Sequence, residues 1–418
     1  MDIGSQGIFS APADLDRLTR FLHNLAQALH TSGMPAHHLE RNLNAIGQRF
    51  GVSIECIAVL TMLTLIISSA EGTKRLDIQR LRFYDYNMAR LIALENLIRE
   101  LDRSVSLESY EARLQKIMNA PPLWSGWPFV LLGFLMSGSI AVLLQGGWIE
   151  VLCGSLTGML FVSGYLALAR VPKLGPAMPV ILCTAAALCA HLLALALPQQ
   201  SIFISALAGV VFLLPGFTFT IAMSELATQN LLSGTGRLAG VFVLLFMMGA
   251  GLTIGTHLCQ NLLATHASGT LASLPAWITV PAIAVLGVSL LGLLQAPLRS
   301  VHVLVGGSLL AWLVYALTSA VLGNIVGAFA GAFAVAIAGH LYASLTGQPD
   351  ILMKIPGLIA LVPGSMGLRG VHALIEKNST AGLQLMTDMA TIGAVLAVGL
   401  LLADNIAPLL FARLKRQR

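Results

Sequence analysis

Two short stretches of the sequence combine a proline-glycine pair with polar side chains inside otherwise apolar segments. The first is LLPGFTFTIAMSEL, residues 213–226, and the second is LVPGSMGLRGVHAL, residues 361–374. Proline removes a backbone donor and clashes with the preceding helical turn, and glycine lets the chain leave the helix at low cost. Each pair therefore predicts a broken helix whose freed amide and carbonyl groups need a polar partner.

The residues of the two pairs and the polar residues after them form the predicted substrate-binding set. These residues are Pro215, Gly216, Thr218 and Thr220 in the first stretch, and Pro363, Gly364, Ser365 and Arg369 in the second. Arg369 could bind a substrate carboxylate through the planar fork of its guanidinium, and the alternative is a charge at the outer rim of a membrane. For the proline-glycine pairs, the alternative is a kink that only shapes helix packing.

Two carboxylates are predicted to exchange protons. Asp388 lies early in the last apolar segment and is expected to be buried there, since ionisable groups at membrane depth are rare and informative. Glu225 follows the first pair, and it is a proton carrier, a partner for a substrate ammonium or a cytosolic loop charge. His191 and His340 also lie in apolar segments, where we expect neutral histidines bonded to a neighbouring helix, with a proton relay as the alternative. Asp404 is interpreted as a boundary residue.

Neither enzymatic nor metal chemistry is expected. The chain contains no HExxH or GxSxG motif and no Walker loop, so we predict neither an enzyme nor ATP-driven transport. His30, His37, His38 and Glu40 have metal-binding residue types, but their spacing matches no defined zinc site. The sequence therefore predicts no metal, no cofactor and no nucleic-acid partner.

Composition places the apolar segments in a membrane. Of 418 residues, 56% are hydrophobic and only 10% are charged, which an ordinary soluble domain does not approach. Residues 1–120 hold 13 basic and 13 acidic residues, whereas the rest of the chain holds 11 and 6, so the net charge of +5 belongs to the apolar part. The N-terminus has no basic region followed by an apolar core, so we expect no cleaved signal peptide.

Residues 1–122 are predicted to form a small cytosolic α+β domain. Amphipathic helices are expected at 14–29, at 35–50 and, as a pair, within 86–119. Residues 52–70 are rich in β-branched side chains, and we interpret them as two strands, with a membrane span as the alternative. Residues 74–83 could add a third strand.

Apolar runs of about 20 residues, enough to cross a bilayer, recur through the rest of the chain. The ten predicted transmembrane helices lie near 127–145, 148–169, 177–197, 201–223, 238–262, 275–295, 300–319, 321–343, 350–371 and 383–411. Lys and Arg residues concentrate in the loops on the side of residues 1–122, so the positive-inside rule predicts that both termini are cytoplasmic.

The second five apolar segments repeat the first five with an offset of 148 residues. Under this offset Pro215 aligns with Pro363, and six glycines of the first half coincide with glycines of the second. Because five is an odd number, the second copy must enter the membrane from the opposite face. The sequence therefore predicts two inverted five-helix repeats, residues 123–270 and 271–418, whose broken helices meet near the midplane.

Three longer patterns carry a family resemblance. They are FLHNLAQALHTSGMPAHHLERNLNAIGQRFG, YNMARLIALENLIRELDRSVSLESYEARLQKI and IPGLIALVPGSMGLRG. Together they resemble the threonine/serine exporter family. The resemblance implies a cytosolic N-terminal domain, ten spans, and efflux of small hydroxy amino acids driven by the proton motive force. A two-component branch of similar proteins is associated with dicarboxylate export, so the substrate does not follow from the resemblance.

We therefore expect a multi-pass protein of the cell inner membrane, a secondary transporter that exports threonine or serine by antiport with protons. Its partners are a small substrate, protons and the lipid bilayer. The alternatives are a dicarboxylate exporter for a substrate such as succinate, and a non-transporting membrane scaffold or sensor. The sequence leaves the oligomeric state open, and a homo-oligomer is compatible with it.

Overall fold

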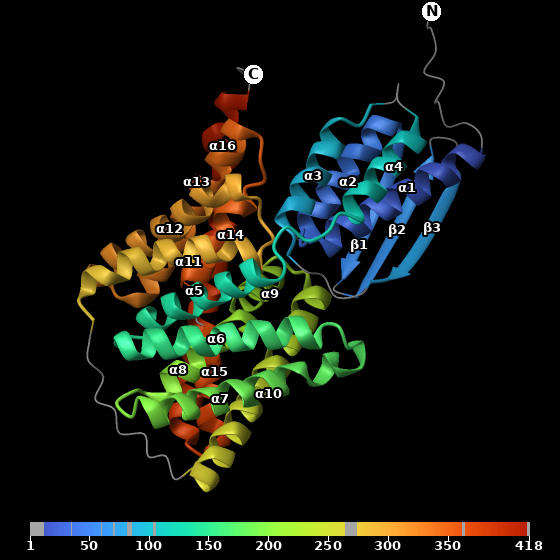
Figure 1. The fold of residues 1–418 in the computed structure, drawn as a ribbon. Coiled ribbons are helices and arrows are strands. Elements are labelled where there is room, and N and C mark those ends of the chain that lie inside the picture. Colours follow the sequence, from blue (N-terminus) through green and yellow to red (C-terminus); the bar gives the residue numbers. More distant parts are fainter. Residues whose placement is uncertain are drawn as a thin grey trace, which may run out of the picture. The chain divides into compact units, whose positions relative to one another are not determined.

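The computed structural model describes residues 12–34, 36–59, 61–69, 72–81, 86–102, 106–263, 274–361 and 364–415. The chain separates into two units, Met1–Leu123 and Trp124–Arg418. The first unit combines helices with a small sheet, and the second is helical throughout its regular elements (Figure 1).

Helices and an antiparallel three-stranded sheet make up the described part of the first unit. They are α1 (Pro12–Thr31), α2 (Ala36–Phe50), β1 (Val52–Val59), β2 (Met62–Ser69), β3 (Lys74–Arg80), α3 (Met88–Arg99) and α4 (Leu107–Met118). The strands lie in the order β1-β2-β3. The interpretation of residues 52–70 as a pair of strands is confirmed, because β1 and β2 form one antiparallel hairpin there.

Alternation along the strands separates the two faces of this sheet. Leu63, Leu65 and Ile67 of β2 are fully buried. Successive strand residues point to opposite faces, and on the other face Leu76 and Ile78 of β3 are exposed. The alternation of buried and exposed residues along β2 and β3 therefore selects the face that forms the core of this unit.

The described part of the second unit is built from strongly apolar helices. They are α5 (Trp127–Leu143), α6 (Trp148–Leu168), α7 (Met178–Ala196), α8 (Ile202–Gly209), α9 (Gly216–Ala227), α10 (Leu231–Leu263), α11 (Thr279–Leu293), α12 (Val301–Leu322), α13 (Asn324–Thr346), α14 (Ile351–Leu361), α15 (Gly364–Ile375) and α16 (Ser379–Lys415). Within the described residues, eight helices are long and apolar enough to cross a membrane, counting α14 with α15 as one. The bent pair of α8 and α9 would supply a ninth, and α5 is a shorter apolar helix. The chain is a polytopic membrane protein.

The helices of the second unit recur with the spacing found in the sequence. α9 and α15 have bounds that differ by 148 residues at both ends, and α10 and α16 begin 148 residues apart. The turns after α9 and α15 share a rare backbone conformation, since φ is 64° at Gln229 and 63° at Lys377. In Figure 1, α9 and α14 lie above α8 and α15, so the two broken helices run in opposite directions.

One apolar core surrounds the two broken helices. Phe219 of α9, Leu245 and Met248 of α10, Leu368 of α15 and Met389 of α16 are all buried in it. These side chains come from both halves of the unit. The core therefore fixes how the broken helices of the two halves cross.

Candidate functional site

The first break separates α8 from α9 at the predicted proline-glycine pair. α8 ends at Gly209, a short 3-10 helix covers Val211–Leu213, and α9 begins at Gly216 with Pro215 as its N-cap. The 45° bend lies between Ile202–Gly209 and Val211–Ala227, a few residues before the proline-glycine pair. The first N–H groups of α9 have no partner within the helix, as at any helix N-terminus.

α14 ends at Leu361 and α15 begins at Gly364, on either side of the second predicted break. Pro363 lies outside the described residues. A Cβ atom added to Gly364 would lie 3.3 Å from Cα of Gly216 and 3.6 Å from Cβ of Leu214. The structure therefore brings Gly216, at the start of α9, close to Gly364, the first described residue after the second predicted break.

A narrow apolar pocket marks this crossing. It is lined by Pro215, Gly216, Phe219, Val241, Leu245, Gly364 and Met389. The pocket has no room for a water-sized molecule. The crossing is therefore closed in this structure, and a substrate can enter only after the surrounding helices move apart.

The predicted polar side chains flank the crossing rather than line the pocket. Thr220 is fully buried, and its hydroxyl donates a hydrogen bond of 3.4 Å to the carbonyl of Gly216 on the same helix. Thr218 and Ser365 are half-buried. All three hydroxyls belong to the first turns of α9 and α15, close to the point where these helices meet.

Arg369 lies on α15, a little more than one helical turn after the second break. Its side chain is half-buried, and its Nε is a buried donor without a hydrogen-bond partner in the part of the chain that the structure describes. Such a donor costs free energy that a bound acceptor would recover. A carboxylate is the acceptor whose geometry fits the guanidinium fork.

The N-terminus of α9 adds positive potential at the crossing. The N-terminus of a helix carries a partial positive charge, and its free N–H groups can donate to an anion. α9 begins at Gly216 and α15 begins at Gly364, and these two glycines are in contact. Together with Arg369 of α15, the N-terminus of α9 favours a ligand that carries a carboxylate.

Glu225, one of the two predicted proton carriers, forms a buried ion pair near the end of α9. Its Oε2 accepts hydrogen bonds from Arg237 Nε at 2.8 Å and from Ser233 Oγ at 2.9 Å. The side chains of Glu225 and Arg237 are both 3% exposed. Glu225 is therefore not a solvated loop charge, and it ties α9 to the first turns of α10.

Substitution of Arg237 by methionine is expected to destabilise the protein strongly, because it leaves the Glu225 carboxylate buried and uncompensated. Removing one partner of a buried pair costs about 3–5 kcal/mol. Thermal unfolding of the purified protein in detergent measures the effect as a lower melting temperature. The double variant Glu225→Gln with Arg237→Met should regain part of the loss, since it buries no unpaired charge. An unchanged melting temperature for Arg237→Met alone would contradict the structural role of this pair.

Asp388, the other predicted proton carrier, is exposed on α16 rather than buried. The buried stripe of α16 runs through Gly382, Met389, Gly393 and Leu396, which recur at helical spacing. Asp388 falls beside this stripe, so its position along the sequence placed it at membrane depth but not inside the helix bundle. Its part in proton exchange stays a prediction.

The two histidines in apolar segments have different surroundings. His191 is buried, and its Nδ1 lies 2.8 Å from the carbonyl oxygen of Ala187. The sequence predicted a partner on a neighbouring helix, and this prediction is wrong, because Ala187 lies on the same helix as His191. His340 has charged neighbours and belongs to a cluster that was not predicted.

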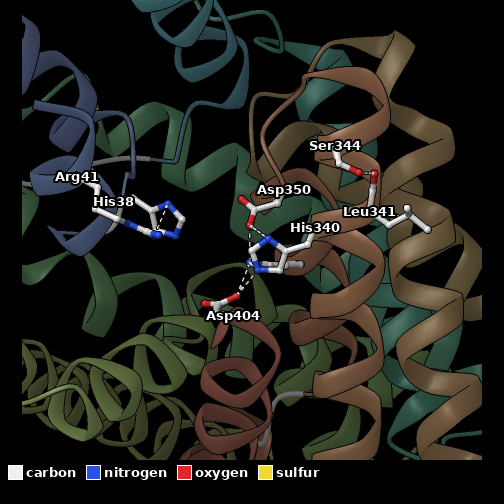
Figure 2. Close-up of polar contacts among 8 residues, drawn as sticks. His38, Arg41, His340, Leu341, Ser344, Asp350 and Asp404 are labelled. Atoms are coloured by element: carbon white, nitrogen blue, oxygen red, sulfur yellow. Dashed lines mark hydrogen bonds and ion pairs between the residues drawn. The ribbon is translucent and has the colours of Figure 1, made fainter. Parts of the chain in front are cut away.

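This cluster consists of His340, Asp350, Lys354 and Asp404, and it joins α13, α14 and α16 (Figure 2). Lys354 Nζ lies 2.5 Å from Asp350 Oδ2 and 2.7 Å from Asp404 Oδ1. His340 Nε2 lies 2.7 Å from the same Asp404 oxygen, and His340 Nδ1 lies 3.6 Å from Asp350 Oδ2. Lys354 is 7% exposed, so the two carboxylates compensate a nearly buried charge.

His340, Asp350 and Asp404 carry ligand atoms that are close enough together to hold a metal ion. The ammonium group of Lys354 lies within 2.7 Å of both carboxylates, where a cation bound to them would lie. In this cluster the lysine therefore takes the place that a metal ion would occupy.

Comparisons with known proteins connect this geometry to a family. One family model, described as a threonine/serine exporter, matches residues 20–259, and a second, described as "Threonine/Serine exporter, ThrE", matches residues 278–406. A "Threonine/serine exporter" of Corynebacterium glutamicum is 25% identical over 348 residues, which cover 77% of this chain and 68% of the relative.

Two fungal proteins are also similar to the chain. The "Pheromone-regulated membrane protein 10" of Kluyveromyces lactis is 21% identical over 89% of this chain, and that of Eremothecium gossypii is 24% identical over 88%. The chain spans 41% and 51% of the lengths of these two relatives. No solved structure matches the chain.

Proposed function

Because the chain belongs to the threonine/serine exporter family, we propose that it is a secondary transporter that exports threonine and serine from the cell by antiport with protons. Members of the family are transporters and not enzymes, and the broken apolar helices of this chain suit that role. We place the protein in the cell inner membrane with both termini in the cytoplasm, since basic residues concentrate in the loops on that side.

We further propose ten spans arranged as inverted repeats of residues 123–270 and 271–418, preceded by a cytosolic domain of residues 1–122. The matching bounds of α9 and α15, the matching turns after them and the opposite directions of the two broken helices support this arrangement. Each repeat then crosses the membrane five times if its broken helix counts as one span.

The substrate site in this proposal lies at the crossing of the two breaks. The close approach of Gly216 and Gly364 is the observation that supports the proposal, because it brings the start of α9 next to the second predicted break. The N-termini and Arg369 would bind the carboxylate of the amino acid. The hydroxyls of Thr218, Thr220 and Ser365 lie close enough along α9 and α15 to bond its polar side chain once the crossing opens.

Closure of the pocket fits a transport cycle. A secondary transporter exposes its site to one side of the membrane at a time, and the two repeats move relative to each other. In this structure the crossing has no room for a substrate. We therefore assign the described conformation to a closed state of the crossing, from which either side can open.

Uptake into vesicles tests this function. The purified protein is reconstituted into vesicles whose interior is more acidic than the medium, and radiolabelled threonine is added outside. Proton antiport should drive threonine uptake above the level seen without a pH gradient, and unlabelled serine should compete with it. Gradient-driven uptake of succinate in place of threonine would assign the protein to dicarboxylate transport. Absence of uptake for both substrates would favour a scaffold or sensor.

A further inference from the structure

One side of α15 carries polar residues from its first turn to the residue after its last turn. They are Ser365, Arg369, His372 and Glu376. Their spacing of four, three and four positions places them on the same side of the helix, over a length of about 16 Å. Leu368 and Val371, on another side of the same helix, are fully buried in the apolar core. Ionisable side chains at membrane depth are rare and line paths or cavities.

α10 adds two polar residues that contact this side of α15. Thr253 Oγ1 lies 3.1 Å from His372 Nδ1, and His257 Nε2 lies 3.4 Å from Glu376 Oε1. On each helix the second partner lies four residues after the first, so α10 and α15 run in the same direction with their turns matched. We call these two pairs, together with Arg369, the polar seam.

Arg369 is the member of the polar seam that lies nearest to the crossing. Thr253 and His372 are 119 residues apart, and so are the members of the second pair. The same offset places Ala250 of α10 at the level of Arg369. Alanine offers no side-chain acceptor, and Arg369 Nε is a buried donor without a hydrogen-bond partner among the described residues. The seam therefore presents an unused donor at this end.

Exposure to solvent or lipid increases along the polar seam away from the crossing. Thr253 is 9% exposed, whereas the side chains of His257 and Glu376, one turn farther on, are 55% and 39% exposed. The seam thus leads from the closed crossing to the end of α15. In the proposed topology α10 and α15 both end at the outer face of the membrane, which is the side where an exporter releases its substrate.

His372 closes the polar seam in this structure. Its ring is stacked on that of Phe203 from α8 with a centroid distance of 5.2 Å, and its Nδ1 contacts Thr253. The helices are also packed closely beside it, since a Cβ atom added to Gly249 of α10 would lie 2.8 Å from Cγ1 of Val371. A ligand can therefore pass along the seam only when the His372 side chain leaves these partners.

We propose that the polar seam is the path by which the amino acid leaves the crossing, with His372 as its gate and Glu376 as the residue that binds the substrate ammonium at the outer end. This inference rests on the proposed function, because it names the route that the exported substrate takes. A zwitterion needs polar partners along such a route, since unpaired charges are costly at membrane depth. Thr253 and His372 supply hydrogen bonds between the carboxylate site at Arg369 and the Glu376 carboxylate.

Replacing His372 by leucine tests the gate, because leucine is of similar size but cannot form a hydrogen bond. Uptake of labelled threonine into vesicles gives the transport rate, and the rise in melting temperature with threonine gives the affinity. We expect the rate to fall about tenfold or more, as for the loss of a hydrogen bond to a charged ligand. The affinity should not change, because Arg369 and the crossing are intact. His372→Gln keeps a hydrogen-bonding group and should recover part of the rate.

Two further variants make this test specific to the polar seam. His302→Leu, at an exposed position near the start of α12, is the matched control and should transport threonine as the unsubstituted protein does. Thr253→Val removes only a hydroxyl group and keeps nearly the same shape, so it decides the matter if His372→Leu does not fold. It should also slow uptake without a change in affinity.

Cysteine labelling tests whether the substrate reaches the outer end of the polar seam. Glu376→Cys and Lys377→Cys place a thiol at neighbouring exposed positions, of which only the first lies on the polar side of α15. Saturating threonine should slow the reaction of Glu376→Cys with a membrane-impermeant thiol reagent and leave that of Lys377→Cys unchanged. The unsubstituted protein gives the background, since its five cysteines are buried or half-buried.

The outcomes separate this inference from the proposed function. If the unsubstituted protein transports threonine and His372→Leu and Thr253→Val transport it at the rate of His302→Leu, the path lies elsewhere and only the inference is overturned. Loss of affinity together with transport would also overturn it, because the seam would then belong to the fold or to the crossing itself. Equal labelling of Glu376→Cys with and without threonine would remove Glu376 from the path. Failure of the unsubstituted protein to take up threonine under any gradient would overturn the proposed function.

Discussion

Replacement of Arg369 by glutamine is expected to abolish threonine transport by removing the charged group that binds the substrate carboxylate. Truncating one partner of a buried charge pair costs about 2 kcal/mol or more, which corresponds to roughly a 30-fold loss of affinity at the least. The free protein should tolerate the change well, because the buried Nε of Arg369 has no hydrogen-bond partner among the described residues. Binding should therefore fall while the melting temperature of the empty protein holds.

Two further variants show whether the geometry of the guanidinium matters or only its charge. Arg369→Lys keeps the positive charge but loses the planar fork, so we expect it to recover binding only in part. Lys377→Gln removes a charge just beyond the same helix at an exposed position, and it should bind threonine as the unsubstituted protein does. Affinity is measured by the rise in melting temperature with increasing threonine. Equal affinity for threonine in Arg369→Gln and the unsubstituted protein would remove Arg369 from the site.

The features that sequence predicts well here are those that depend on neighbours along the chain. The strands at 52–70 were predicted from their β-branched residues, and the structure places β1 and β2 there. Pro215 and Gly216 likewise break the helix at the predicted position, because the missing N–H and the missing Cβ act locally. The offset of 148 residues could be read from glycine and proline positions alone, and helix bounds now match it.

The charge cluster could not be predicted in this way, because its members are distant in sequence. His340 and Asp404 are separated by 64 residues, and only Asp350 and Lys354 are close enough to be recognised as a helical i,i+4 pair. Glu225 and Arg237 are 12 residues apart, on either side of the turn between α9 and α10. In the sequence alone, a solvated loop carboxylate cannot be distinguished from a buried one such as Glu225, because the turn that brings Arg237 into contact with it is not apparent there.

For Asp388, the sequence placed the residue in the correct helix, but the prediction that its side chain is buried is wrong. Its distance from the start of the last segment suggested burial, but the angle around the helix decides which side chains face the bundle. Met389, the next residue, is 2% exposed, whereas Asp388 is exposed. A strict stripe of small and apolar residues at helical spacing is the signal that could have placed Asp388 outside the core.

A leucine at Gly364 is expected to abolish transport by forcing the two breaks apart. A Cβ atom at this position would already be 3.3 Å from Cα of Gly216, so even alanine requires a small shift, and a longer side chain has no space. Overpacking of this kind costs about 1–3 kcal/mol, which a polytopic protein of this size can survive as a folded molecule. Gly216 and Gly364 would then no longer lie close together, and threonine binding should be lost with transport.

The matched control is Gly306→Leu on α12, where a Cβ atom would meet nothing within 4 Å. The same gain in side-chain volume should leave uptake unchanged there, and an alanine at Gly364 should fall between the two leucine variants. Uptake, threonine affinity and melting temperature are measured on all three. If Gly364→Leu transported threonine at the rate of Gly306→Leu, the contact between the breaks would be a packing feature, and the substrate site would have to lie elsewhere. The opposite result is a graded loss of transport from alanine to leucine at Gly364, with no loss for leucine at Gly306. It would tie transport to the close approach of Gly216 and Gly364, because the substitutions at Gly364 disturb that approach and the substitution at Gly306 does not.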